Sequence, residues 1–188
     1  MADRLTKITT RGGDKGETSL GDGSRITKAD PRIALLGDVD EVNSWIGVVL
    51  SHSPGEVLRD LLEGVQHDLF DLGGALCFPG APVLTPAHLT RLDEAAQTLN
   101  ENLPPLKEFI LPGGSALISW LHLARAVTRR AERTLINAMQ ESDIEGNGLA
   151  YLNRLSDVLF IAARFEAARL GIPETYWQKH KSAQNNGE

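Results

Sequence analysis

The chain has 188 residues, of which 41% are hydrophobic and 23% charged, an ordinary composition for one globular domain. Its formal net charge of −6 argues against non-specific binding to nucleic acid or to an anionic membrane surface. The single cysteine excludes intramolecular disulfides and cysteine-based zinc sites. Because no segment has the pattern of a secretory signal or a membrane-spanning helix, we expect a cytoplasmic protein.

The beginning of the chain differs in pattern from the rest. Residues 1–32 are rich in glycine and lack a helical hydrophobic pattern, which predicts a structured loop or a short hairpin. From about Leu35 onward, apolar residues recur at helical spacing. We expect the first helix to be capped by Asp38 or Asp40 and to run through Leu50.

Start and stop signals divide the remaining chain into four further helices. Ser53 and Thr85 each precede a proline, which is the pattern of a helix cap followed by a first-turn proline. We expect the helix that Ser53 opens to end near Gly73. The fourth helix is predicted over residues 115–140, which contain no glycine or proline, and the fifth over residues 149–170.

Five helices with mostly short connections predict an all-α protein, a five-helix bundle with a ferritin-like up-and-down arrangement. We expect a single domain, with a loop over 1–32, the bundle over 35–171 and a tail over 172–188. The charge is unevenly distributed. Residues 33–111 carry a net charge of −9, whereas residues 1–32 carry +2, residues 112–171 carry +1 and the tail is neutral.

A glycine-containing segment over residues 9–19, TTRGGDKGETS, is the first candidate site. Glycines let backbone N–H groups approach phosphate oxygens, and Arg11 and Lys15 supply positive charge. The segment lacks the Gly-Lys-Ser/Thr sequence of a Walker A loop. Its composition leaves two interpretations open, an anion-binding loop and a plain turn.

The long fourth helix carries the second candidate. Arg125, Arg129 and Glu132 are spaced so that they share one helix face. Two arginines one turn apart repel each other unless an anion or a carboxylate lies between them. The face is therefore either an ordinary solvated surface or a site that clamps phosphate.

Two further segments are candidates. Asn153 and Asp157 share a face of the last helix, which is either solvent-exposed or functional. Phe109 begins the segment FILPGG over residues 109–114, directly before the long helix. This segment is either a linker whose Phe plugs the end of the bundle or a loop that delivers an apolar side chain to a ligand pocket.

Five segments, in this order, closely resemble the PduO-type ATP:cob(I)alamin adenosyltransferases. They are ITTRGGDKGETSL (8–20), LLGDVDEVNSWIG (35–47), FILPGG (109–114), ARAVTRRAER (124–133) and YLNRLSDVLF (151–160). The resemblance implies transfer of the 5′-deoxyadenosyl group of ATP to cob(I)alamin, with release of triphosphate and with Mg²⁺ bound to the phosphates. It also implies a homotrimer of five-helix bundles, with active sites between adjacent subunits.

The same resemblance implies the residues that bind ATP. In the N-terminal loop they are Thr10, Arg11, Gly12, Gly13, Lys15, Thr18 and Ser19, with Lys28 as a further basic contact. In the long helix they are Arg129, Arg130, Glu132 and Arg133. Arg129 is expected on phosphate and Glu132 near the ribose or the metal. Asn153 matches a nucleotide contact on the last helix.

The resemblance also implies the catalytic residues. Phe109 matches an aromatic residue that crowds the lower face of the corrin ring, which excludes the lower axial ligand and makes the cobalt easier to reduce. Arg125 matches an arginine that pairs with an aspartate across the subunit boundary. Asp40 is the matching partner, and Asp38 is the alternative.

This chemistry requires little of the protein's own side chains. Cobalt(I) is itself a strong nucleophile, so the protein supplies orientation and electrostatics. The spacing of serine, histidine and aspartate indicates no catalytic triad, in agreement with such a reaction. The alternative is a non-catalytic bundle that binds ATP or carries adenosylcobalamin. A reductase and an adenosylcobalamin-dependent enzyme are the macromolecular partners to expect.

Overall fold

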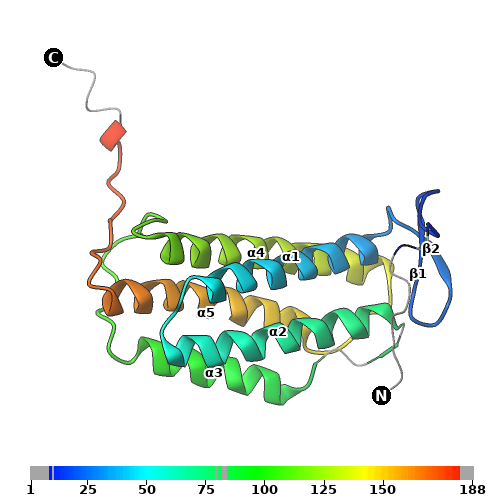
Figure 1. The fold of residues 1–188 in the computed structure, drawn as a ribbon, viewed down its shortest axis with the longest axis horizontal. Coiled ribbons are helices and arrows are strands. Elements are labelled where there is room, and N and C mark those ends of the chain that lie inside the picture. The colour runs from blue at the N-terminus through cyan, green and yellow to red at the C-terminus, as the bar shows by residue number, and fades with distance from the viewer. Residues whose placement is uncertain (1–8, 10, 79, 82–83, 183–188) are drawn as a thin grey trace.

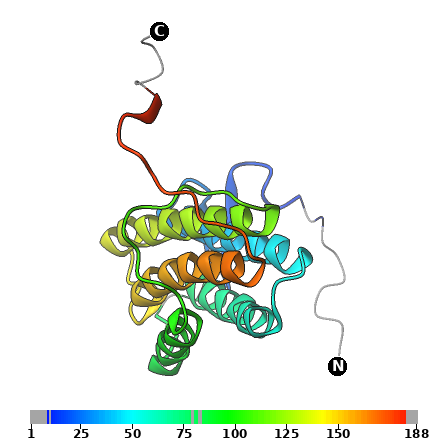
Figure 2. The same ribbon diagram turned by 90° about the vertical axis from the view of Figure 1, so that its left-hand side faces the viewer.

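The computed structural model describes residue 9 and residues 11–78, 80–81 and 84–182. Its helices are α1 (Pro31–Ser51), α2 (Glu56–Cys77), α3 (Pro86–Asn100), α4 (Ala116–Glu141) and α5 (Gly148–Arg169). Successive helices run in alternating directions along one elongated bundle (Figure 1), which Figure 2 shows end-on. The predicted all-α, up-and-down bundle is confirmed.

No helix among the described residues combines the length and the apolar character that crossing a bilayer requires.

The glycine-rich beginning of the chain forms a short hairpin. Strands β1 (Glu17–Ser19) and β2 (Arg25–Thr27) pair in antiparallel fashion. The turn between them is attached to the end of α2, because Gly21 N donates a hydrogen bond to Cys77 O at 2.7 Å. A side chain on Gly21 would clash with the ring of Phe78, which would lie within 2.7 Å of its Cβ. This close approach holds the hairpin against one end of the bundle (Figure 1).

The starts of α1 and α2 differ from the prediction. Helix α1 begins at Pro31, where the carboxylate of Asp30 accepts a hydrogen bond from Arg32 N at 2.8 Å and caps the helix. The prediction that Asp38 or Asp40 caps α1 is therefore wrong, because both residues lie inside the helix. Helix α2 begins at Glu56 with Gly55 as its N-cap, and Ser53 instead has a left-handed backbone with φ of 53°.

The glycine pair at Gly73 and Gly74 does not end α2, contrary to the prediction. Leu72 and Leu76, on either side of the pair, are both fully buried, and their packing retains the last turns of the helix. The predicted start of α4 is close to the observed one, since Ser115 Oγ accepts a hydrogen bond from Ile118 N at 3.3 Å. Tertiary burial thus overrides a weak local signal at α2.

Helix α4 lies at the centre of the packing. It packs most extensively against α5 on one side and against α1 on the other, while α2 packs on α1 and α3 packs on α5. Leucine, isoleucine, valine and alanine side chains fill the interior. Among those fully buried are Leu35, Ile46, Leu62, Leu121, Leu152 and Leu159.

A buried carboxylate ties three of the helices together. Asp68 on α2 is 4% exposed and accepts a hydrogen bond from the Tyr151 hydroxyl on α5 at 2.7 Å. The same carboxylate pairs with Arg91 on α3, and His88 Nε2 lies 3.7 Å from it. Burial raises the pKa of Tyr151, so the hydroxyl keeps the proton that it donates. Only Leu92 and Leu99 of α3 are buried, so the helix has few apolar contacts. The Asp68 network therefore helps to hold α3 against the bundle.

We predict that Asp68→Ala lowers the free energy of unfolding by about 3 kcal/mol, because it leaves the buried Tyr151 hydroxyl without its acceptor and Arg91 without its partner. The matched control is Asp93→Ala, which removes an exposed ion pair with Arg154 and should cost less than about 1 kcal/mol. Urea unfolding at constant m-value measures both changes. Equal losses for the two variants would contradict the assigned role of Asp68.

Candidate active site

One side of α4 brings together several of the residues singled out from the sequence. Glu132 Oε1 accepts a hydrogen bond from Asn153 Nδ2 on α5 at 3.0 Å. About two turns earlier, the guanidinium of Arg125 lies 5.9 Å from the centre of the Phe160 ring on α5. Arg129, between them in sequence, is exposed. This α4–α5 face therefore combines two cations with hydrogen-bonding side chains.

The two arginines of this face have no carboxylate partner among the described residues. Arg125 Nε is buried and makes no hydrogen bond there. Burial lowers the pKa of Arg125, the neighbouring charge of Arg129 lowers it further, and Asp157 opposes both effects. Uncompensated cations one turn apart favour an anion from outside the chain, and arginine binds phosphate or carboxylate through two parallel hydrogen bonds.

His122 lies one turn before Arg125 and is 5% exposed. Its ring meets the Phe160 ring edge-on with centroids 6.0 Å apart, and its Nδ1 has no hydrogen-bond partner within the described chain. Burial lowers the pKa of His122, Arg125 lowers it further, and Glu174 acts in the opposite direction. The imidazole is thus neutral at the edge of the cationic face. In the sequence, only the spacing of His122 from Arg125 indicates that the imidazole lies beside this face.

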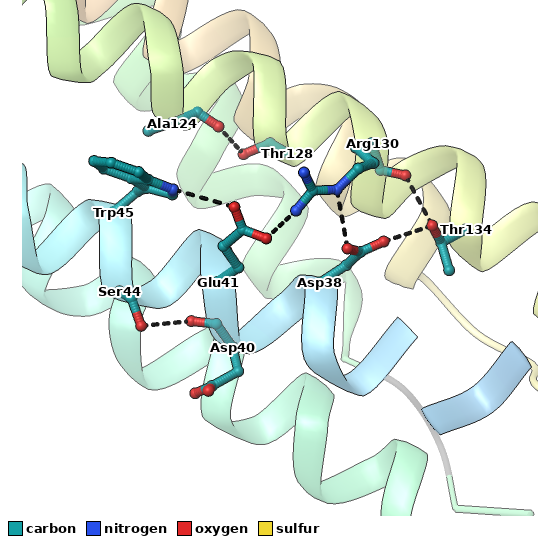
Figure 3. Close-up of polar contacts among 9 residues, drawn as sticks. All are labelled: Asp38, Asp40, Glu41, Ser44, Trp45, Ala124, Thr128, Arg130 and Thr134. Carbon is teal, nitrogen blue, oxygen red and sulfur yellow. Dashed lines mark hydrogen bonds and ion pairs between the residues drawn. The ribbon is translucent and has the colours of Figure 1, made fainter. Parts of the chain in front are cut away.

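On the opposite side of α4, the arginine has carboxylate partners. Arg130 Nε donates to Asp38 Oδ1 on α1 at 3.0 Å, and the same guanidinium pairs with Glu41 (Figure 3). Thr134 Oγ1 donates to the second oxygen of Asp38 at 2.5 Å. Arg130 was expected to contact a nucleotide. In this chain it joins α4 to α1, and the nucleotide contact stays a prediction. Arg133, further along α4, is exposed.

Asp40 is exposed and forms no ion pair among the described residues. Figure 3 shows it on α1 with its side chain directed away from α4. It borders a groove of about 620 Å³ between α1 and α2, which is also lined by Leu36 and by Phe70, a phenylalanine 70% exposed. Because Arg125 contacts α5, the predicted Asp40–Arg125 pair does not form within one chain. Asp38 is occupied by Arg130, so Asp40 is the carboxylate available to another molecule.

The N-terminal loop gathers positive charge around its glycines. Arg25 Nη2 donates to Gly12 O at 2.9 Å and pairs with Glu17 at 3.3 Å across the hairpin. The ammonium of Lys28 lies against Gly13, where an added Cβ would come within 2.8 Å of Nζ. Sequence reasoning missed Arg25, because its contact with Gly12 depends on the hairpin register.

The remaining predicted loop residues lie around this contact. Arg11 has a left-handed backbone with φ of 61°, and Lys15 is exposed. Thr18 is half-buried in β1, and Ser19 Oγ accepts a hydrogen bond from Arg25 at 3.3 Å. Thr10 lies outside the described residues. The structure thus clusters basic and hydroxyl side chains beside exposed glycine backbone, as an anion-binding loop requires.

Phe109 is 78% exposed and belongs to the segment between α3 and α4. This segment lies at the end of the bundle opposite the hairpin (Figure 1). Helix α4 has 26 residues and at 1.5 Å per residue spans roughly 39 Å between these two ends. One chain therefore does not bring Phe109 and the N-terminal loop into one site.

The sequence profile of the cobalamin adenosyltransferase family matches residues 8–166. The chain belongs to this family. It is 45% identical over 185 residues to the cobalamin adenosyltransferase of Cupriavidus metallidurans, covering 97% of this chain and 100% of the relative. It is 44% identical over 177 residues to the corrinoid adenosyltransferase of Mycobacterium leprae, covering 87% and 93% of the two chains.

A solved structure of a family member has the same fold. A variant PduO-type ATP:corrinoid adenosyltransferase from Lactobacillus reuteri, complexed with cobalamin and ATP, matches with a TM-score of 0.88 and 38% identity. The match covers 92% of this chain and 100% of that chain. The family inferred from the five sequence segments is confirmed.

The buried imidazole of His122 gives a prediction for the pH dependence of stability. The pKa of His122 is lower in the folded chain than in the unfolded chain. Below about pH 6.5, the unfolded chain therefore binds a proton at this histidine more readily than the folded chain does. Stability is therefore lost as the pH falls through this range. We predict that His122→Gln reduces the drop in unfolding free energy between about pH 7.5 and pH 5. The control His67→Gln, at an exposed position, should leave the drop unchanged. A drop of wild-type size in His122→Gln would refute the assignment.

Proposed function

We propose that this protein transfers the 5′-deoxyadenosyl group of ATP to cob(I)alamin, forming adenosylcobalamin and releasing triphosphate. The observation that carries the proposal is the α4–α5 face, where Arg125 and Arg129 have no ion-pair partner within the described part of the chain and lie beside Glu132 and Asn153. Membership of the cobalamin adenosyltransferase family and the likeness to a protein complexed with cobalamin and ATP support it.

The proposed reaction is an in-line displacement at the 5′-carbon of ATP. Cobalt(I) attacks the 5′-carbon of ATP, the cobalt–carbon bond forms, and the carbon–oxygen bond breaks with its electron pair leaving on triphosphate. Arg129 of α4 and Lys15 of the N-terminal loop bind the phosphates and offset the charge that develops on the leaving group. Holding the two reactants in line supplies the rest of the acceleration, because the nucleophile needs no activating base.

Magnesium is the metal to expect with ATP. The described residues contain no group of three His, Cys, Asp or Glu side chains that could form a protein-only metal site. Glu132 has carboxylate oxygens and its hydrogen-bond partner Asn153 has an amide oxygen, which suits an ion held mainly by phosphate oxygens and only one or two protein groups. When bound, Mg²⁺ neutralises charge on the triphosphate.

The active site is shared between subunits of a homotrimer. Two observations support this arrangement. Asp40 and the exposed Phe70 border an open groove on the α1–α2 side, whereas Arg125 is directed toward α5. The N-terminal loop and Phe109 lie at opposite ends of the bundle (Figure 1). Contacts between copies bring Asp40 to Arg125 and complete the set of residues around both substrates.

Phe109 acts on the corrin. Its exposed ring covers the lower face of the macrocycle and keeps the lower axial ligand away from cobalt, which leaves the metal easier to reduce. A reductase supplies the cob(I)alamin, and an adenosylcobalamin-dependent enzyme consumes the product. A non-catalytic carrier of ATP or adenosylcobalamin would need neither this wedge nor the full set of phosphate-binding cations.

We predict that the wild-type protein, given ATP, Mg²⁺ and chemically reduced cobalamin, converts the corrin absorption spectrum to that of adenosylcobalamin.

Phe109→Ala should lower kcat by about 100-fold while the KM for ATP changes less than about twofold, because the ring orients the corrin and touches no phosphate. The control is Val57→Ala, which truncates another exposed apolar residue. Full activity in Phe109→Ala would refute the role of the ring, and no conversion by the wild type would favour the carrier.

A further inference from the structure

The chain that follows α5 forms a strap across the segment that carries Phe109. We call residues 172–177 the C-terminal strap. Trp177 N donates a hydrogen bond to Phe109 O at 2.7 Å, and Leu111 N donates to Thr175 O at 2.8 Å. These bonds flank an antiparallel bridge between Ile110 and Tyr176. The backbone of Phe109 is therefore fixed by a segment more than 60 residues away in sequence.

The strap also places a second aromatic residue opposite Phe109 in the backbone pairing. Residues opposite each other in an antiparallel pair project their side chains to the same face of the ribbon. Trp177 is the neighbour of Phe109 across the bridge, and both side chains are exposed, at 43% and 78%. Two aromatic side chains thus share one exposed face, and each is positioned by the same pair of backbone segments.

One buried guanidinium anchors this arrangement to the bundle. Arg164 on α5 is 5% exposed, and its Nε donates to Glu174 Oε1 in the strap at 2.8 Å. Its Nη2 donates to Pro104 O at 2.7 Å, in the connection that leads to Phe109. The same side chain thus holds the strap and the segment before Phe109. Ile172 packs against the hydrophobic core and lies close to Gly114, where an added Cβ would come 3.1 Å from its Cγ2.

Stability alone does not account well for such a pair. Removing two charges from water costs about as much as their attraction returns, and apolar side chains of similar size often serve stability equally well. What the Arg164 guanidinium adds is direction, because its planar donors fix Glu174 and Pro104 in one geometry. Phe109, largely exposed, has little packing of its own to fix its place.

We propose that the Arg164–Glu174 pair is a positioning device for Phe109, acting through the backbone bridge between the C-terminal strap and residues 109–111. The inference rests on the proposed function, in which the Phe109 ring lies against the corrin. Arg164 and Glu174 are positioning residues, because they touch neither substrate and set only the place of the ring. Loss of the pair loosens the bridge and lets the ring leave the corrin face.

The test is Glu174→Gln, which keeps the size of the side chain and removes its charge. We expect kcat to fall about tenfold or more with the KM for ATP unchanged, because a displaced ring misaligns the corrin and not the nucleotide. Amide hydrogen exchange, measured in the absence of substrates, should become faster in peptides covering residues 109–111 and 175–177. Combining Glu174→Gln with Phe109→Ala should give the same kcat as Phe109→Ala alone, because both changes act on one ring.

The matched control is Arg169→Gln, which breaks a comparable ion pair on the same helix. Glu166 accepts from Arg169 at 2.6 Å and from Gly55 N at 3.0 Å, so that pair joins α5 to the start of α2 and does not contact the strap. We expect Arg169→Gln to lower stability without changing kcat or hydrogen exchange in the strap. Arg164→Lys is the second test variant. It retains the charge and loses the planar fork, and should reproduce the effect of Glu174→Gln.

Several results would overturn the inference. A folded Glu174→Gln variant with wild-type kcat and unchanged exchange at 109–111 would do so, as would kcat losses that multiply in the double variant. An effect of equal size in Arg169→Gln would show a general loss of stability instead. If the wild-type protein forms no adenosylcobalamin, the proposed function fails, and the exchange measurement then separately decides whether the pair fixes residues 109–111.

Discussion

Helix α4 carries positive charge on two sides, and ion pairs among the described residues neutralise only one of them. Toward α1, Arg130 meets Asp38 and Glu41, so that its charge joins two helices of the same chain. Toward α5, Arg125 and Arg129 meet an aromatic ring and each other. Arg130 has two carboxylate partners, whereas Arg125 and Arg129 have no ion-pair partner among the described residues. The face of α4 that carries them can therefore bind an anion from outside the chain. The function depends on this asymmetry.

The length of α4 imposes the second constraint. The helix spans roughly 39 Å, with the N-terminal loop at one end of the bundle and the segment between α3 and α4, which carries Phe109, at the other (Figure 1). Substrates that contact both must meet parts of two molecules. The groove between α1 and α2, with Asp40 and the exposed Phe70 on its border, offers the apolar surface and the free carboxylate that a second copy requires. The charge on α4 and the length of α4 thus lead to the same arrangement.

The sequence predicted the elements whose signals are local. Thr85 and Ser115 lie at the starts of α3 and α4 because capping depends on neighbouring backbone groups. The predicted start of α1 was wrong. The stronger capping signal, Asp30 followed by a proline, lies within the segment that was interpreted as a loop. Gly73 did not stop α2 because buried leucines on either side of it retain the helix, and such burial depends on the whole fold.

The candidate site divides in the same way. The Arg125 face follows from helical spacing, so sequence reasoning found it. The sequence also singled out Glu132 and Asn153 separately, but the hydrogen bond between them depends on the packing of α4 against α5 and was not predicted. The contacts of Arg25 with Gly12 and of Arg164 with Glu174 depend on a hairpin register and on a chain reversal after α5. No spacing in the sequence indicates them, since the partners belong to different elements.

The central claim, that each active site is shared between two copies, is tested most directly by complementation. Asp40→Ala and Arg125→Ala subunits are co-expressed with different affinity tags, and mixed assemblies carrying both tags are purified and assayed. Each variant alone should be nearly inactive. If the two residues meet across subunits, each purified mixed trimer has both residues intact at one of its three interfaces, so about one third of wild-type activity returns. Mixed assemblies as inactive as either variant alone would place both residues in one chain's site and contradict the account.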